Sequence, residues 1–480
     1  MFTATDYLGS YLESFAGFER HAAGREPRWI QSLRRNAFAR FREVGFPTTH
    51  DEDWRFTNVS EIARTPFRLA RNRSTAISAS DLRQWRVAGE ACLLVFVNGH
   101  FSRELSEIDK LPRGAMVGGL AENIDCGDRV LEQHMGRYLD VGRDAFCALN
   151  TAFAADGAYV HIRRGAVIEG AIHLLFVSTG TDTPVMSHPR NLIVAEQDSQ
   201  ATIIEDYVSL GSGVAFSNSA TELVASDNAV LSHYRIEQEH RKTFNVSTLR
   251  IQQGRSANVA SHSVLVGGAL VRNNVHPVLA GEGSECLING LFVGGGSQHI
   301  DNYMLVEHVS PHCGSRQYYN GILDDRAHGV FHGRIIVHKQ AQKTDAKQTN
   351  RNLLLSDDAQ IDTKPQLEIY ADDVKCTHGA TIGQIEEDAL FYLRARGIDE
   401  ASARRLLLAA FAGECLERMK ESGIREHIEK LINDRMLKLA TARSGAMAAS
   451  AEPVLACAGD GSLSGSRRGE HAGRTLEEIA

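Results

Sequence analysis

The most constraining feature of this sequence is residues 88–380, which consist almost entirely of short strand-like segments. Stretches rich in Val, Ile, Leu and Thr recur there between Gly, Asp, Asn and Ser, as in AYVHI, NLIVAEQ and GRIIVHK. Frequent alternation favours strands over helices. Helical periodicity is nearly absent, and few connections are long enough for crossover helices, so a parallel βαβ sheet is not expected. A large antiparallel sandwich and a β-solenoid both remain open, because no strict repeat is visible.

Helical patterns flank this region on both sides. Before it, Ile30, Ala37 and Phe41 fall at helical spacing, and Pro27 stands where a first turn would begin. The stretch DEDWRFTNV then interrupts the pattern, and its acidic trio is followed by Trp54. We interpret this stretch as a loop held in place by an aromatic anchor.

After the strand-rich region, Asp399 is a plausible N-cap, and Gly423 suits a helix stop. Two apolar stripes predict amphipathic helices: Leu408, Phe411, Ala412, Cys415, Leu416 and Met419 in the first, and Ile424, Ile428, Leu431 and Ile432 in the second. From about residue 441 the composition turns to Ala, Ser, Gly and Arg and predicts disorder. We therefore expect a helical region 1–87, a β region 88–380, a helical domain 381–440 and a disordered tail 441–480.

Composition excludes several classes of function. The net charge is −8 and there is no basic block, so no nucleic-acid partner is indicated. No apolar run approaches the roughly 20 residues of a membrane helix, and the N-terminal residues lack the pattern of a secretory signal. We expect a cytoplasmic protein with no membrane partner. Eight cysteines occur without any CxxC spacing, so a metal centre would need ligands gathered by folding or shared with a partner chain.

Cys376 and His378 form the most specific candidate site. Residues two apart in a strand project from the same face, so the two side chains would lie side by side with Val374. Thiolate and imidazole are a fitting ligand pair for iron or zinc, although a free cysteine is more often a buried core residue.

A histidine-rich region surrounds this pair and is a second candidate. Its members are His299, His308, His312, His328, His332, His338 and His378. None shows HxH or HExxH spacing, so they fit hydrogen-bonded strand residues at least as well as metal ligands.

Motifs for ATP and for acyl transfer are absent. The sequence has no GxxxxGK[ST] loop and no nucleophile elbow. The acidic pairs Asp324-Asp325, Asp357-Asp358 and Asp372-Asp373 could serve glycoside chemistry if folding brought two of them together. More often such pairs mark turns at the ends of strands.

Several long segments, in order, resemble the SufB/SufD family of the SUF iron–sulfur cluster assembly system. They are DEDWRFTNV, DGAYVHIRRGAVIEGAIHLLFVSTG, HIDNYMLVEHVSPHCGSRQYYNGILDD, TNRNLLLSDDAQIDTKPQLEIYADDVKCTHGATIGQ and DALFYLRARGI. The Cys376-Thr377-His378-Gly379 segment resembles the SufD branch, whereas SufB chains carry an acidic segment there and further N-terminal cysteines. A SufB-like paralogue and a polysaccharide-active β-helix enzyme are the alternatives.

The resemblance implies a mainly β fold, a right-handed parallel β-helix flanked by N-terminal and C-terminal helical regions. It also implies a scaffold without enzymatic activity or an ATP site of its own, working with SufB and with the ATPase SufC. SufB would pair through the β-helix, and a nascent iron–sulfur cluster would form at that interface beside His378 and Cys376. SufC would dock on the C-terminal helical domain, where Arg404, Arg405, Leu408 and Phe411 are the candidate contacts. The resemblance further implies a reduced flavin as a possible component of the complex.

Overall fold

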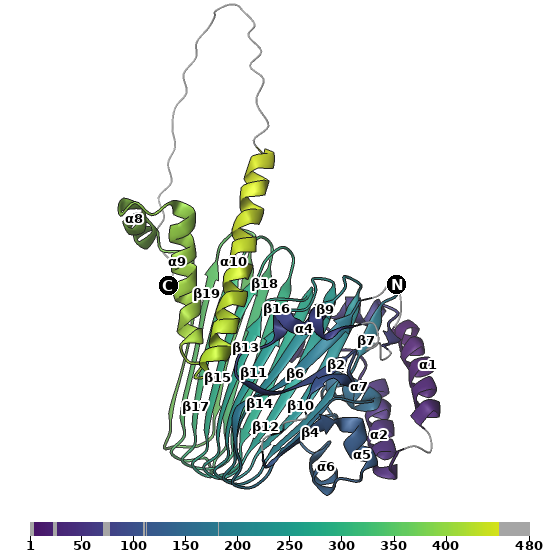
Figure 1. Cartoon of the computed structure of the whole chain (residues 1–480). Coiled ribbons are helices and arrows are strands. Elements are labelled where there is room, and N and C mark those ends of the chain that lie inside the picture. The colour runs from purple at the N-terminus through teal and green to yellow at the C-terminus, as the bar shows by residue number, and fades with distance from the viewer. Residues whose placement is uncertain are drawn as a thin grey trace, which may run out of the picture. The chain divides into compact units, whose positions relative to one another are not determined.

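The chain winds as a parallel β-solenoid in which successive strands alternate between two facing sheets (Figure 1). The structure, a computed structural model, describes residues 4–22, 26–70, 77–108, 111, 113–180 and 182–450. The chain divides into two compact units, residues 1–439 and 440–480. Within the second unit, only residues 440–450 are described, and they form the last part of helix α10 (Ser422–Ser450).

The strand order settles the architecture that the sequence pattern left open. The first sheet runs in the order β20 (Gln360–Ile369), β18 (His328–Val337), β16 (His299–His308), β14 (Leu270–Leu279), β12 (Thr243–Gln253), β10 (Ala215–Ala225), β8 (Arg190–Ala195), β5 (Ala158–Ile162) and β4 (Ala115–Gly119), with β1 (Arg68–Leu69) and β7 (Val185–Ser187) beside this path. The second runs in the order β21 (Lys375–Gly383), β19 (Asp345–Leu354), β17 (Gly314–Leu323), β15 (Glu285–Gly294), β13 (Asn258–Leu265), β11 (Val230–Glu237), β9 (Gln200–Leu210), β6 (Val167–Thr179), β2 (Glu90–Val97) and β3 (His100–Glu107). Apart from the antiparallel pairs β2–β3 and β4–β5, neighbouring strands are parallel, which confirms the solenoid and excludes the sandwich.

One corner of the solenoid is built from stacked left-handed turn residues. Asp198, Asn228, Ser256, His312 and Lys343 all have positive φ. In each case the amide donates to a carbonyl of the next coil, as from Asp198 to Asp227 (3.0 Å) and from His312 to Gln342 (2.9 Å). Residue types that tolerate this conformation differ from coil to coil, and so does the spacing between them. The structural repeat therefore leaves no strict repeat in the sequence.

Three short helices fall within the region where the sequence predicted strands alone: α5 (Leu120–Asp125), α6 (Arg129–His134) and α7 (Ala145–Phe153). The expectation that helices are nearly absent from 88–380 is thus wrong for residues 120–153. Every residue of α7 is buried, so it shows no apolar stripe that periodicity could detect. Its N-cap is Asp144, whose carboxylate accepts from the amides of Phe146 and Cys147.

The N-terminal helices pack outside the solenoid in two clusters, an aromatic cluster that includes residues of β10 and β12 and a smaller cluster with residues of β2 and β6 (Figure 1). These elements are α1 (Ala4–Ala22), α2 (Arg28–Val44), the 3-10 helix η1 (Glu52–Trp54), α3 (Ser60–Arg64), α4 (Ala79–Leu82) and the 3-10 helix η3 (Arg83–Trp85). The predicted aromatic anchor lies at η1, where the Arg272 guanidinium stacks 3.8 Å from the Trp54 ring centroid. The nearby Thr57 hydroxyl donates to the Asp301 carboxylate of β16. The motif DEDWRFTNV therefore fastens the N-terminal region to the outer face of the first sheet.

The C-terminal region contains α8 (Glu387–Ala395), α9 (Glu400–Leu416) and α10. As predicted, the Asp399 side chain caps α9, accepting from the Ser402 amide (2.9 Å). The two apolar stripes pack α9 and α10 on the outer face of the second sheet. Gly423 is not a helix stop, because it lies in the first turn of α10. A Cβ there would collide with the carbonyl oxygen of Ala88, so the position needs glycine for close packing.

Helix α10 continues to Ser450, so residues 441–450 are helical although the sequence predicted no order for 441–480. Residues 451–480 of that tail lie outside the described residues, and for them disorder stays a prediction. Among the described residues, no helix has both the length and the apolar character that crossing a membrane requires.

Candidate functional site

The solenoid ends in an open coil made of β20 and β21. Within the described chain, β20 pairs only with β18 and β21 only with β19, so each leaves one backbone edge unpaired. In the strands of the earlier coils, almost all side chains that point into the solenoid are buried. In the last coil, the residues of β20 are mostly half-buried and those of β21 mostly exposed. Exposed apolar side chains include Ile369, Tyr370 and Ile382. This end therefore presents both unpaired strand edges and uncovered core.

Cys376 and His378 both belong to β21 and face the inside of the solenoid. Their partners in register on β19 are Ala346 and Gln348, and both partners are buried. The pair thus extends two interior columns of side chains by one further coil. The two residues share a face, as the strand spacing predicted, and they are open to solvent because no later coil covers them.

The two side chains differ in their surroundings. Cys376 is half-buried and packs with Val374 against the main core, and burial raises the pKa of its thiol. His378 is exposed. Behind His378, Gln348 donates to the side-chain oxygen of Gln317 (3.0 Å), while its own Oε1 is buried without a hydrogen-bond partner among the described residues. An interior polar column therefore leads up to His378.

The other histidines of the candidate region do not converge on one point. In five of these histidines, a ring nitrogen lies within hydrogen-bonding distance of another polar side chain. The pairs are His299 with Thr57 (2.9 Å), His308 with Ser315 (2.8 Å), His328 with Asp362 (2.7 Å), His332 with Gln366 (2.8 Å) and His338 with Glu307 (3.4 Å). His312 is one of the left-handed turn residues. The described part of the chain holds no group of three or more His, Cys, Asp or Glu residues arranged to bind a metal ion.

The acidic pairs lie in turns between strands. Asp324-Asp325 follows β17, and the other two pairs lie in the turns after β19 and β20. Asp325 has positive φ and its carboxylate accepts from the Gly296 amide (2.8 Å). Hydrogen-bonded turn residues are the simpler interpretation of these pairs.

Of the α9 residues predicted to contact an ATPase, two pack toward the solenoid and two lie on the outer surface of the helix. Leu408 is buried against the solenoid, and Phe411 is half-buried beneath the Arg351 guanidinium. Arg404 forms an ion pair with Glu400 (3.1 Å), and Arg405 is exposed. In this structure Leu408 holds α9 in place, and the arginines face outward.

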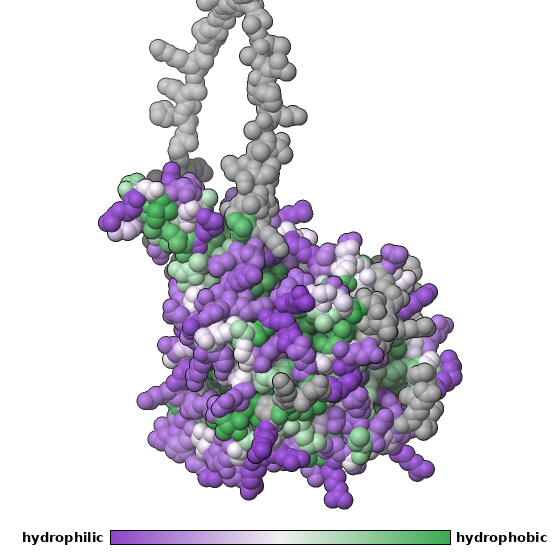
Figure 2. Space-filling model, viewed as in Figure 1, coloured by the Kyte–Doolittle hydropathy of each residue, from purple (hydrophilic) through white to green (hydrophobic). Residues whose placement is uncertain are grey.

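A surface that the sequence did not single out lies on α8 and α9 (Figure 2). Phe391 is 75% exposed, Tyr392 56% and Leu406 52%. A cavity of about 580 Å³ adjoins it, lined by Phe391, Arg394 and Arg404 among others. The sequence could not identify these residues, because exposure of an apolar side chain depends on how α8 is placed and not on its periodicity. Large exposed apolar residues in one area are typical of an interaction surface.

Comparison with known proteins decides the family. Residues 5–174 match the SufBD protein N-terminal region, and residues 176–411 match the family described as SUF system FeS cluster assembly, SufBD core domain. The chain belongs to the SufBD family. It is 34% identical to an iron–sulfur cluster assembly SufBD family protein of Synechocystis sp., covering 86% of this chain and 93% of the relative.

Two further relatives carry the name SufD. The iron–sulfur cluster assembly protein SufD of Escherichia coli is 30% identical over 87% of this chain and 95% of its own length. The SufD of Bacillus subtilis is 24% identical over 89% and 97%. Membership of the SufBD family gives the chain a role in iron–sulfur cluster assembly by the SUF system.

Proposed function

We propose that this SufBD chain is the SufD-type subunit: a scaffold without ATPase activity that pairs with SufB and forms the cluster assembly site at their interface. The observation that carries the proposal is the open coil, because it places His378 and Cys376 on an uncovered inner face between unpaired strand edges. An exposed strand edge is a template for pairing with another chain. A second solenoid would continue both sheets and cover the exposed core at once.

The ligand chemistry is consistent with a shared site. A thiolate and an imidazole can bind iron, but two ligands do not complete a cluster. Since the described chain offers no third ligand beside them, the remaining ligands of the nascent cluster would come from SufB. The cluster is the cargo of this site, formed and passed on. The reduced flavin expected from the resemblance belongs to the proposal as a component of the assembled complex.

ATP hydrolysis would come from SufC, which docks on α8 and α9 in this proposal. The sequence lacks a phosphate-binding loop, and the exposed Phe391, Tyr392 and Leu406 offer apolar anchors, with Arg404 and Arg405 at their margin. Aromatic and arginine side chains are enriched among the energetically dominant residues of interfaces. The SufB-like alternative is less well supported, because Cys376 and His378 occupy a segment that is acidic in SufB chains.

Co-expression with SufB and SufC tests the proposal. We expect all three chains to co-purify and the complex to contain iron and acid-labile sulfide. Either failure to bind SufB or binding of SufB without iron and sulfide would contradict it. Cleavage of a glycan panel by the chain alone would instead favour the polysaccharide-active alternative.

A further inference from the structure

A cavity of about 520 Å³ lies between α10 and the turns that follow β11 and β13. On α10 its lining residues repeat at helical spacing and therefore share one face: His427, Lys430, Leu431, Asp434 and Arg435. Trp85 and Val266 contribute apolar wall on the other sides. No residue of the open coil, α8 or α9 lines this cavity, so it is separate from the surfaces of the proposed function.

Cationic side chains gather here without carboxylate partners. Arg241, Lys430 and Arg435 all line the cavity, and none of them forms an ion pair with another described residue. The arginines donate to neutral acceptors, Arg241 to the carbonyl of Gly295 (3.2 Å) and Arg435 to the side-chain oxygen of Gln298. The carboxylates of Asp325, which acts on both arginines, and of Glu237, which acts on Arg435, offset part of this positive charge without forming an ion pair with them.

Arg435 is a buried cation whose hydrogen-bonding capacity is only partly used. It is only 9% exposed, and its Nε is buried without a hydrogen-bond partner among the described residues. Burial lowers its pKa to about 10, and the neighbouring Arg241 charge acts in the same direction. An anion in the cavity would offset the repulsion between the two guanidinium groups.

The nearby acidic side chains are mostly engaged elsewhere. The Glu239 carboxylate turns into the solenoid, where it accepts from Ser178 (2.5 Å), Ser217 (2.8 Å) and Asn245 (2.6 Å). That leaves Asp434 as the acidic group on the cavity wall.

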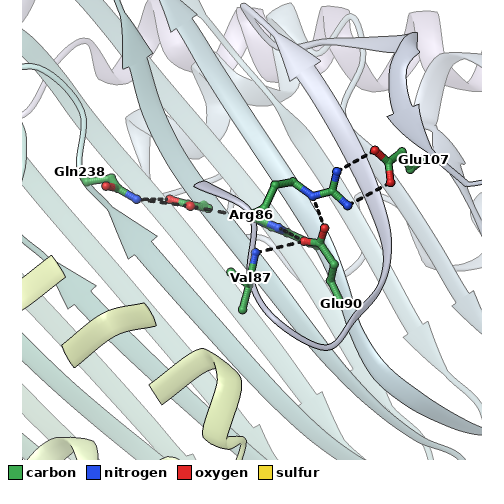
Figure 3. Close-up of polar contacts among 7 residues, drawn as sticks. Arg86, Val87, Glu90, Glu107 and Gln238 are labelled. Carbon is green, nitrogen blue, oxygen red and sulfur yellow. Dashed lines mark hydrogen bonds and ion pairs between the residues drawn. The ribbon is translucent and has the colours of Figure 1, made fainter. Parts of the chain in front are cut away.

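Gln238, also on the wall, donates to the buried Asp206 (3.0 Å). Figure 3 shows Gln238 at one end of a line of polar contacts that reaches Arg86, Glu90 and Glu107. The Asp206 carboxylate is thus engaged within this network behind the wall.

We propose that this cavity binds the phosphate group of a small, nucleotide-sized molecule. Arg241 and Arg435 would hold the phosphate, and Trp85, Val266 and Leu431 would contact the organic part. Guanidinium groups match the oxygen geometry of phosphate. The volume lies in the range of small-molecule sites and exceeds what a bare phosphate fills. Sequence alone could not reveal the site, because its cations come from a loop and a helix about 190 residues apart.

FMN and riboflavin form a sharp pair of probes, because they differ only in the phosphate and both fluoresce. Titrated into the full chain, FMN should bind with one-to-one stoichiometry, riboflavin at least about tenfold more weakly, and pyrophosphate should compete with FMN. Arg241→Gln and Arg435→Gln should each weaken FMN binding about tenfold. Arg425→Gln, on the same helix but outside the cavity, should leave it unchanged.

Three outcomes would overturn the inference: equal binding of riboflavin and FMN, FMN binding that survives Arg241→Gln, or pyrophosphate binding without FMN binding. Arg241 is exposed, so its variant keeps the test valid if Arg435→Gln destabilises the fold. Because the readout needs neither SufB nor SufC, failure here leaves the proposed assembly function untouched.

Discussion

His378 occupies an inward-facing position of a solenoid and is nevertheless exposed to water. One coil earlier the same column holds Gln348, which is buried. An inward position at an uncovered end is expected to become buried only when a partner arrives. In the proposed complex this side chain would be accessible before assembly and shielded after it, as a nascent cluster requires.

Replacing His378 by Ala should therefore abolish cluster assembly without unfolding the chain. An exposed side chain costs little when truncated, within about 0.5 kcal/mol. In the co-expressed complex we expect iron and sulfide to fall several-fold while the melting temperature and subunit ratio stay unchanged. Thr377→Ala, at the outward-facing neighbour on the same strand, is the matched control. Full loading of a well-folded His378→Ala complex would rule out a ligand role.

Asp206 gives a prediction about pH and stability. Burial raises its pKa from 3.8 to about 6, and the carboxylate lies 3.9 Å from His173 Nε2, which has no hydrogen-bond partner among the described residues. Because the folded-state pKa exceeds the unfolded value, the folded state holds the proton more tightly. This group therefore lowers stability as pH rises from about 4 to about 6, by up to about 3 kcal/mol.

Asp206→Asn removes this titration, and its amide can still accept from Gln238 while donating toward His173. We expect the variant to be more stable than the wild type at pH 7.5, with the difference shrinking toward pH 4.5, in denaturant titrations across that range. A variant that is less stable at pH 7.5 would show that the ionised carboxylate contributes favourably to the folded state.

At the residue scale, the sequence predicted which side chains share a strand face, but it did not predict whether that face is exposed to solvent. The two-residue spacing placed Cys376 and His378 on one face together with Val374. Their access to solvent depends on β21 being the last strand of its sheet, which no local pattern encodes.

At the scale of elements, α9 and α10 are part of the solenoid's own packing. Their buried residues, including Ala412, Cys415 and Ile428, share a cluster with Ile204 and Tyr234 of the second sheet. Deleting residues 386–440 would therefore expose a large apolar face and confuse loss of SufC binding with loss of fold. Substitutions on the exposed face of α8 separate the two effects.

Phe391→Asp is the sharpest such substitution. The side chain is 75% exposed, so stability should change little, whereas loss of a central aromatic anchor commonly costs about 2 kcal/mol or more of binding. We expect SufC to be lost from the purified complex while SufB is retained. Val167→Asp, at another exposed apolar position on β6, serves as control. Normal SufC content in the Phe391→Asp complex would place the ATPase contact elsewhere.

Helices with one buried and one exposed face could be predicted from the sequence, whereas a helix buried on all sides could not. Amphipathic α9 was found with its N-cap at Asp399, because one face is buried and the other exposed. Helix α7 was missed because it is buried on all sides, and the role of Gly423 was misjudged because its close contact is with Ala88, far away in sequence.

At the scale of the whole molecule, the solenoid is covered at one end and open at the other. At the end where the coils begin, the antiparallel strands β3 and β4 contribute Phe101 and Val117 to the main core. The last coil has no such cap in the described chain, and half-buried core residues such as Ile361 and Leu367 line it. The sequence indicated strands but not this asymmetry, since stacking of coils is a long-range property and the turn residues that mark each coil vary in type.

The open end predicts that a charge on its inner face will block pairing with SufB specifically. Ala380 continues the buried column of Asn350 and is itself exposed, so Ala380→Arg should be tolerated in the isolated chain. In the pair the added guanidinium would be buried without a partner, which is strongly unfavourable. We expect SufB to be lost on co-purification, SufC to be retained, and the melting temperature of the isolated chain to stay unchanged. Thr377→Arg introduces the same charge on the outer face of β21 and should disturb SufB binding much less. If Ala380→Arg still yields a stoichiometric complex with SufB, the partner does not cover the inner face of the last coil, and the assembly site must lie on another surface of the chain.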